Sequence, residues 1–132
     1  MSETKLENFK NALARFNESI EDFKDKRGDK YESTFRDSLI KRYEITFELG
    51  WKALADFLVS ERVKLENRAP KTVLRAAHVN GYINDEKLWL DILEIRNLTV
   101  HTYGEEFVKE FTEIIIKTYA PALNSLLTMF EK

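Results

Sequence analysis

Four residues in one short run of this sequence have side chains that could perform chemistry: Arg96, Asn97, His101 and Tyr103. An arginine can stabilise negative charge on a phosphate, and a histidine can donate or accept a proton near neutral pH. On a helix, Asn97 and His101 would lie side by side because they are four residues apart. His101 would then occupy the last turn, where the helix dipole favours the protonated imidazole. This run is therefore the candidate functional site.

Each of these residues also has an ordinary structural interpretation. Arg96 falls on the apolar side of its predicted helix, and a buried guanidinium needs a partner. It either forms an ion pair with Glu44 or Glu48, or it faces a polar cleft. A histidine at a helix end is commonly a surface residue, and Tyr103 would commonly belong to the core. The spacing alone leaves these interpretations open.

The elements that must position these side chains are predicted to be helices. Only four glycines and two prolines occur in 132 residues, too few for a chain built from many short strands. A second helix is expected from about 31 to 59, with Gly50 in its apolar face where another helix can approach closely. The first helix ends near Gly28 and carries apolar residues alternately three and four positions apart: Leu6, Phe9, Leu13, Phe16, Ile20 and Phe23.

The candidate run is expected to lie at the end of one continuous helix. Asn84-Asp85 offers caps for a helix that begins near Glu86. The apolar spacing predicts that this helix continues to about Tyr103, with Gly104 as its C-terminal stop.

Two more helices complete the predicted fold. A short one covers 71–79 after Pro70, a residue that suits the first helical position. The last runs from Glu105 towards Phe130, and Pro121 should kink or break it. The sequence thus predicts one all-α domain over residues 1–132, an up-and-down bundle of four longer helices and one short helix.

The composition excludes several classes of site. With 23 acidic and 21 basic residues the net charge is −2, which argues against strong sequence-independent binding to duplex phosphates. The chain has no cysteine and only two histidines, His78 and His101, so a zinc–cysteine site, a thiol nucleophile and a histidine-rich metal cage are excluded. We expect no metal and no cofactor. No apolar run approaches the length of a membrane span, so we expect a cytoplasmic protein without a membrane partner.

The spacing Arg-x4-His-x-Tyr over 96–103 resembles the signature of the HEPN superfamily, and specifically of its HepT-like branch. Longer segments are similar to the family of nucleotidyltransferase substrate-binding proteins: RYEITFELGWKALADFL (42–58), APKTVLRAA (69–77) and WLDILEIRNLTVHTY (89–103). The resemblance extends from the second predicted helix to the last. Arg-x4-His alone would be weak evidence because it occurs by chance in many helices, whereas the run RN-x-T-x-HTY is specific.

The resemblance implies a HEPN-like bundle that forms a homodimer and is encoded beside a minimal nucleotidyltransferase. Arg96 and His101 of both subunits would form a catalytic cleft that cuts RNA without metal, with the HEPN protein as toxin and the nucleotidyltransferase as antitoxin. Asn97 would be the adjacent polar residue, and Tyr103 the acceptor that the nucleotidyltransferase modifies with AMP. The older family name implies instead a non-catalytic subunit that presents a substrate to its partner.

Chemistry supplies a reason for the dimer. Metal-free RNA cleavage needs a base for the 2′-hydroxyl, an acid for the leaving oxygen and a cation for the added negative charge. One His101 cannot act as base and acid at once, but two copies across a symmetric dimer can. Ile45 and Leu49, apolar residues outside the main apolar face of the second helix, also predict a partner surface.

Three functions therefore remain open at this point. The first is an endoribonuclease toxin, and the second is a binding module that positions a nucleotide or substrate for its partner. The third is a purely structural dimerisation domain in which Arg96 is an ion-paired core residue.

Overall fold

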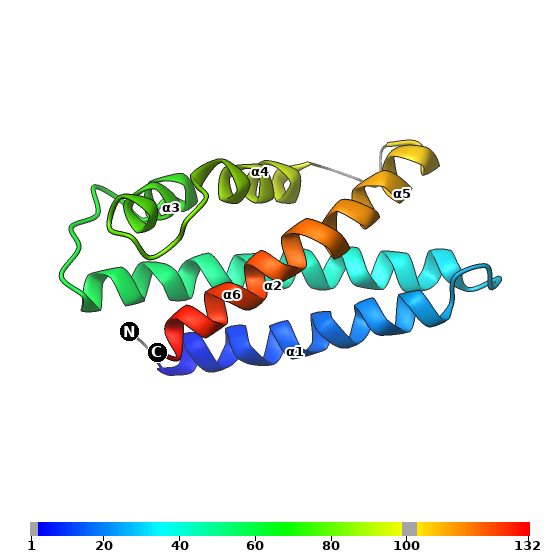
Figure 1. Cartoon of the computed structure of the whole chain (residues 1–132), viewed down its shortest axis with the longest axis horizontal. Helices are drawn as coiled ribbons and strands as arrows, with labels where there is room; N and C mark the ends of the chain where they lie inside the picture. Colours follow the sequence, from blue (N-terminus) through cyan, green and yellow to red (C-terminus); the bar gives the residue numbers. More distant parts are fainter. Residues whose placement is uncertain (1–2, 99–102) are drawn as a thin grey trace.

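The computed structural model describes residues 3–98 and 103–132, and every regular element within these ranges is helical. Figure 1 shows α1 and α2 as a long hairpin, with α3 and α4 following one another along α2 and α6 crossing it. The all-α, up-and-down bundle expected from the sequence is confirmed. Its elements are α1 (Glu3–Asp25), α2 (Glu32–Ser60), α3 (Pro70–Val79), α4 (Glu86–Asn97), α5 (Glu105–Ile114), a π-helical stretch (Ile115–Tyr119) and α6 (Ala120–Phe130).

The central element of the bundle is α2, which packs against each of the other α-helices. The apolar seam of α1 faces it, and five of the six predicted seam residues are buried, from Phe9 to Phe23. Gly28 lies in the turn between the two helices with φ of 80°, a left-handed conformation that glycine adopts without strain. The prediction of the first two helices from apolar spacing is therefore confirmed.

Gly50 lies on α2 where residues of both α1 and α6 contact it closely. A Cβ atom at this position would lie 2.9 Å from Cε1 of Phe9 and 3.4 Å from Cδ2 of Leu126. Phe9 cannot move aside freely, because its buried ring packs edge-on against Phe130 with the ring centroids 5.8 Å apart. The predicted close approach at Gly50 is therefore confirmed.

Replacing Gly50 with alanine should lower the free energy of unfolding by about 1 kcal/mol, because overpacking beside Phe9 outweighs the gain in helix propensity. Urea unfolding followed by circular dichroism would measure the change. Ala53, one turn further along α2, already carries a buried Cβ and gives the matched substitution Ala53→Gly, which should also destabilise the protein. A more stable Gly50→Ala variant would contradict the packing argument.

The fourth helix ends earlier than the sequence predicts. Asp85 caps it as expected, with its Oδ1 accepting a hydrogen bond of 3.0 Å from the backbone N–H of Leu88. However, α4 stops at Asn97, since Leu98 is already extended with ψ of 143°. The prediction that this helix continues to Tyr103 is wrong. That prediction rests on apolar spacing. It gives too little weight to helix propensity, since the residues after Leu98 include threonine, valine and histidine, which are all poor helix formers.

Gly104 has a different role from the one predicted. It is not the stop of α4 but the N-cap residue of α5, with φ of −66° and ψ of 160°. Glycine is accepted at an N-cap as well as beyond a helix C-terminus. Gly104 therefore indicates a helix boundary in the sequence, but not whether the helix precedes or follows it.

The sequence predicts that Pro121 kinks or breaks the last helix, but the helix continues past it, and a π-helical stretch precedes it. Figure 1 shows α5 and α6 as parts of one continuous rod. The five residues before α6 form the π-helical stretch, and Pro121 lies in the first turn of α6. Proline lacks an N–H, and its ring clashes with the carbonyl four residues earlier in a regular helix. The wider π turn relieves this clash.

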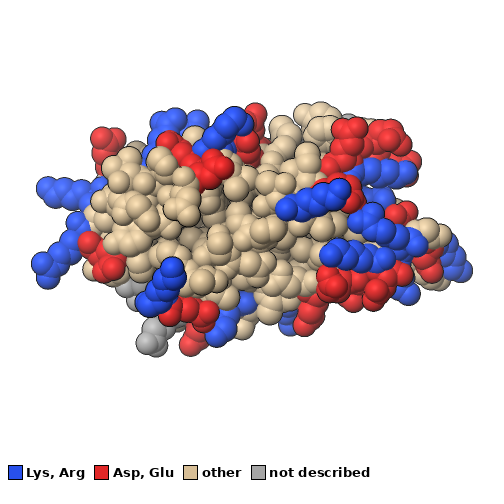
Figure 2. Space-filling model, viewed as in Figure 1, with Lys and Arg blue, Asp and Glu red and all other residues tan. Residues whose placement is uncertain are grey.

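The surface carries charges of both signs close together. Figure 2 shows positive and negative side chains interspersed at both ends of the molecule, while the middle of the face in view is mostly uncharged. Several of these charges form pairs one helical turn apart, such as Lys87 and Asp91 at 2.9 Å. Within residues 3–98 and 103–132, no helix has the length and apolar character needed to cross a membrane.

Candidate functional site

Arg96 lies in the last turn of α4, facing α2. Its side chain is 32% exposed, and one terminal nitrogen lies 3.8 Å from Oε2 of Glu48. The Nε atom is buried and has no hydrogen-bond partner among the described residues. Arg96 is therefore a partly accessible cation with unused hydrogen-bonding capacity.

Glu48 is held by residues of its own helix more tightly than by Arg96. Its Oε2 accepts a hydrogen bond of 3.2 Å from Nε1 of Trp51, and its Oε1 lies 3.3 Å from Nζ of Lys52. Glu44 lies 4.0 Å from Lys41. Of the two ion pairs considered from the sequence, the structure therefore forms the one with Glu48. The Trp51 contact was not predicted, although its spacing of three residues places both side chains on one helix face.

Arg96 also borders an open surface depression, whose accessible lining is more apolar than polar. This depression of about 210 Å³ is lined by Lys41, Glu44, Ile45, Glu48 and Leu49 in addition to the arginine. Ile45 is 41% exposed at this depression, so an apolar side chain and a guanidinium lie on the same open surface. Two cations and two carboxylates line it, which leaves Arg96 close to electrically balanced surroundings.

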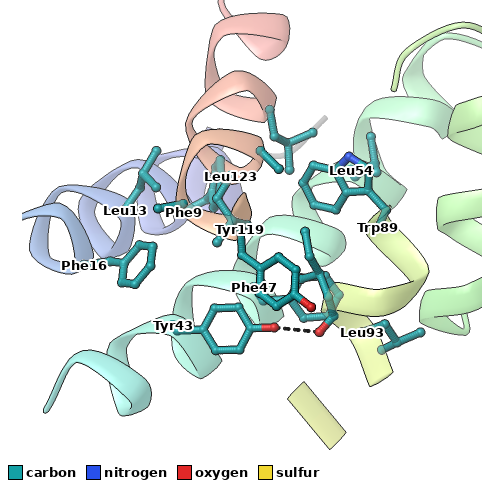
Figure 3. Close-up of a cluster of buried hydrophobic side chains, with 14 of the residues drawn as sticks. Phe9, Leu13, Phe16, Tyr43, Phe47, Leu54, Trp89, Leu93, Tyr119 and Leu123 are labelled. Carbon is teal, nitrogen blue, oxygen red and sulfur yellow. Dashed lines mark hydrogen bonds between the residues drawn. The ribbon is translucent and has the colours of Figure 1, made fainter. Parts of the chain in front are cut away.

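Tyr43 fixes the position of the helix turn that carries Arg96. Its hydroxyl donates a hydrogen bond of 2.7 Å to the backbone carbonyl of Ile92, one turn before Arg96 (Figure 3). The ring of Tyr119 stacks on Tyr43 at 5.9 Å between centroids. Burial raises the pKa of Tyr43 well above its ordinary value, the nearby Tyr119 raises it further, and Arg96 acts in the opposite direction. The phenol therefore stays neutral and holds α4 against α2.

Asn97 and Tyr103, the other site residues that the structure describes, are not on one helix. Asn97 is the last residue of α4 and is exposed. His101 lies outside the described residues, so its distance from Arg96 and Asn97 is not defined. The predicted helical neighbourhood of Asn97 and His101 therefore also lies outside the described residues, and α4 itself ends at Asn97.

Tyr103 lies on the surface just before α5. It is 46% exposed, and its ring stacks on Phe107 with centroids 4.5 Å apart. The interpretation of Tyr103 as a core residue is therefore wrong, since it lies beyond the end of α4 rather than on its apolar side. Its position leaves the phenol accessible from outside.

Titratable residues elsewhere in the described ranges do not form a metal centre. Within this part of the chain, no three histidine, cysteine, aspartate or glutamate side chains lie close enough to hold one ion. His78 is instead placed 3.5 Å from Glu86, which also lies 3.5 Å from Arg75.

The helical bundle has the same fold as a solved HEPN toxin, and it places Arg96 at the end of one helix and Tyr103 just before the next. Residues 4–132 match the family described as nucleotidyltransferase substrate-binding protein like. The chain belongs to that family. No curated protein sequence matches it.

Three solved structures illustrate the likeness. A protein from Thermus thermophilus is 31% identical, with a TM-score of 0.77 over 94% of this chain and 99% of that one. A mutant form of the toxin–antitoxin pair MntA–HpeT gives 14% identity and 0.75 over 97% and 95%. The tri-AMPylated Shewanella oneidensis HEPN toxin, in complex with MNT antitoxin, gives 14% identity and 0.74 over 99% and 98%. The last two share the fold at low sequence identity.

Proposed function

We propose that this chain is the toxin-type partner of a minimal nucleotidyltransferase antitoxin, and that a homodimer of it cuts RNA without a metal ion. Arg96 supplies the cation for the phosphate, and His101 from each of two subunits supplies the acid and the base. Asn97 supports them from the end of α4. The observation that carries the proposal is Arg96, a partly exposed guanidinium with only a loose ion pair and an unpartnered Nε.

The surface around Arg96 supports the dimer. Ile45 is exposed beside it, and Leu49 lies one turn further along α2. Exposed apolar side chains beside a cation favour contact with another protein surface. Such a contact would exclude water from the place where the phosphate binds. Two copies meeting through this face would bring two Arg96 side chains to one cleft.

The purified chain, without a partner, should scatter light as twice the 15.6 kDa monomer. It should cut RNA in excess EDTA and leave cyclic or 3′-phosphate ends, which mass spectrometry of the fragments identifies. A monomer at micromolar concentration would refute the composite site. Intact RNA from a well-folded dimer would refute the catalytic role.

Modification of Tyr103 is the proposed control of this activity. An AMP group on the exposed phenol adds a bulky anion seven residues along the chain from Arg96, and this anion would repel an approaching RNA phosphate. That a HEPN toxin of the same fold is tri-AMPylated in complex with its MNT antitoxin supports this role.

Co-expression with the partner nucleotidyltransferase should add AMP to Tyr103 and suppress cleavage, as read by mass spectrometry and RNA assays. Tyr103→Phe should escape suppression while keeping activity. Tyr31→Phe, at a similarly exposed tyrosine, provides the control and should remain suppressible. Suppression of Tyr103→Phe equal to that of the unchanged chain would contradict the assignment.

A second function is favoured by the carboxylates around Arg96. Glu44 and Glu48 offset the two cations of the depression, which weakens attraction for a polyanion such as RNA. In this alternative, the chain is a non-catalytic subunit that binds a substrate for the nucleotidyltransferase, in keeping with the family's description. A stable complex with the partner, combined with RNA that stays intact, would favour it.

A further inference from the structure

Arg36 is a buried arginine with too few partners. Its side chain, near the beginning of α2, is only 6% exposed. Its closest carboxylate is Glu32, one turn earlier, at 3.5 Å, and its Nε has no hydrogen-bond partner among the described residues. The guanidinium lies over the ring of Phe23, 5.4 Å from its centroid. A buried guanidinium normally forms several hydrogen bonds, so Arg36 has unused hydrogen-bonding capacity.

Arg36 lines a depression at the end of the molecule where the α1–α2 turn meets α5, separate from the depression at Arg96. The depression has a volume of about 270 Å³. It is lined by Phe23, Arg27, Glu32, Arg36, Lys109 and Glu113. Figure 2 shows charged side chains of both signs gathered at this end of the molecule.

Three cations from three different segments converge on this depression. Arg27 comes from the turn after α1, Arg36 from α2 and Lys109 from α5. Each of the two more exposed cations has one carboxylate nearby: Glu113 lies 3.0 Å from Arg27, and Glu105 lies 3.5 Å from Lys109. Of these carboxylates only Glu113 lines the depression, together with Glu32, so cations outnumber carboxylates there by three to two.

We propose that this depression binds a phosphate group, with Arg36 as its principal ligand and Arg27 and Lys109 as supporting cations. Guanidinium groups match the oxygens of phosphate in geometry and hold them through charged hydrogen bonds. Cations arriving from three directions suit the several oxygens of a phosphate better than the two coplanar oxygens of a carboxylate. The site shares no lining residue with the Arg96 depression, so it stands independently of the proposed ribonuclease activity.

The sequence signal for Arg36 is its position: it is a charged residue on an otherwise apolar stripe of α2. Arg36 lies on the same stripe as Ile40, Tyr43 and Phe47, all of which are buried. An arginine on such a stripe either pairs with a carboxylate of the protein or binds an anion.

The test uses thermal unfolding of the full chain with inorganic phosphate, compared with chloride and acetate at equal ionic strength. Phosphate should raise the melting temperature and the other two anions should not. Lys109→Gln should weaken phosphate binding several-fold, whereas Glu113→Gln should strengthen it by freeing Arg27. Lys10→Gln is the matched control, because Lys10 is also exposed, pairs with Glu131 at 3.3 Å and lies away from the depression.

Arg36→Met tests the principal ligand directly. Methionine can fill the space of the arginine stem, and the partly exposed Glu32 can be solvated once its partner is removed. The variant should bind phosphate roughly tenfold more weakly, as expected for loss of a charged hydrogen bond. If this variant unfolds, the opposite effects of Lys109→Gln and Glu113→Gln still decide the question, since misfolding cannot strengthen binding.

Competition identifies the source of the phosphate group. Displacement of inorganic phosphate by AMP assigns the site to a nucleotide, and displacement by a short single-stranded RNA but not by AMP assigns it to a nucleic-acid backbone. Displacement by neither leaves free phosphate as the ligand. Equal stabilisation by phosphate and acetate, or equal phosphate effects in all variants, would overturn the proposal.

Discussion

Replacing Arg96 with alanine should lower the rate of RNA cleavage by roughly 10²- to 10⁴-fold. The loss follows from the proposed function, in which this guanidinium stabilises negative charge on the phosphate as the bond breaks. His101→Ala should cause a loss of similar size by removing both the acid and the base of the dimer. Single-turnover cleavage of a labelled RNA in EDTA measures both effects.

The fold should survive the Arg96 substitution. The side chain is one-third exposed and its pair with Glu48 is long, so its removal should change the free energy of unfolding by about 1 kcal/mol or less. Arg75→Ala is a suitable control, because it also removes a partly exposed arginine that lies 3.5 Å from a glutamate. Cleavage at the normal rate by Arg96→Ala, or its global unfolding, would contradict a catalytic role.

The second large effect concerns alkaline stability. Burial raises the pKa of Tyr43, so the folded protein keeps this phenol protonated where the unfolded chain, with an ordinary pKa near 10, releases the proton. The stabilisation is therefore complete below pH 10 and is lost as the pH rises above it. Each further pH unit should cost up to about 1.4 kcal/mol through this residue.

Tyr43→Phe should flatten this alkaline decline. At pH 7 the variant should lose about 1 kcal/mol because the carbonyl of Ile92 loses a donor, but its stability should fall less steeply above pH 10. Urea unfolding between pH 8 and 11 measures both slopes. Tyr31→Phe is the control, because Tyr31 is half exposed and should leave the slope unchanged. Parallel slopes for Tyr43→Phe and the unchanged chain would contradict the assignment.

Local periodicity predicted the parts of the fold where propensity and packing agree. The seam of α1, the close approach at Gly50 and the start of α3 at Pro70 all follow from residues that act within one or two turns. The end of α4 could not be predicted in the same way. There the apolar spacing favours a longer helix, the residue types disfavour it, and Tyr103 packs on Phe107 of α5 instead.

The candidate site was predicted in part for the same reason. The pairing of Arg96 with Glu48 follows from two apolar faces that must meet, so the sequence could suggest it. The arrangement of Asn97 and Tyr103 depends on where α4 ends. The lack of hydrogen-bond partners at Arg36 depends on three segments that meet only in the folded chain.

The π-helical stretch before Pro121 also has a consequence for the rotational phase of the last helix. Phe111 and Leu123 are both buried, yet in an uninterrupted α-helix positions twelve residues apart point about 120° away from each other. A π turn takes up one extra residue, or about 100° of rotation, and so returns both side chains to the core. The stretch thus meets two demands at once. Pro121→Ala alone would leave the phase mismatch, and deletion of one residue alone would leave the clash of the proline ring, so only the two changes together would restore a uniform α-helix.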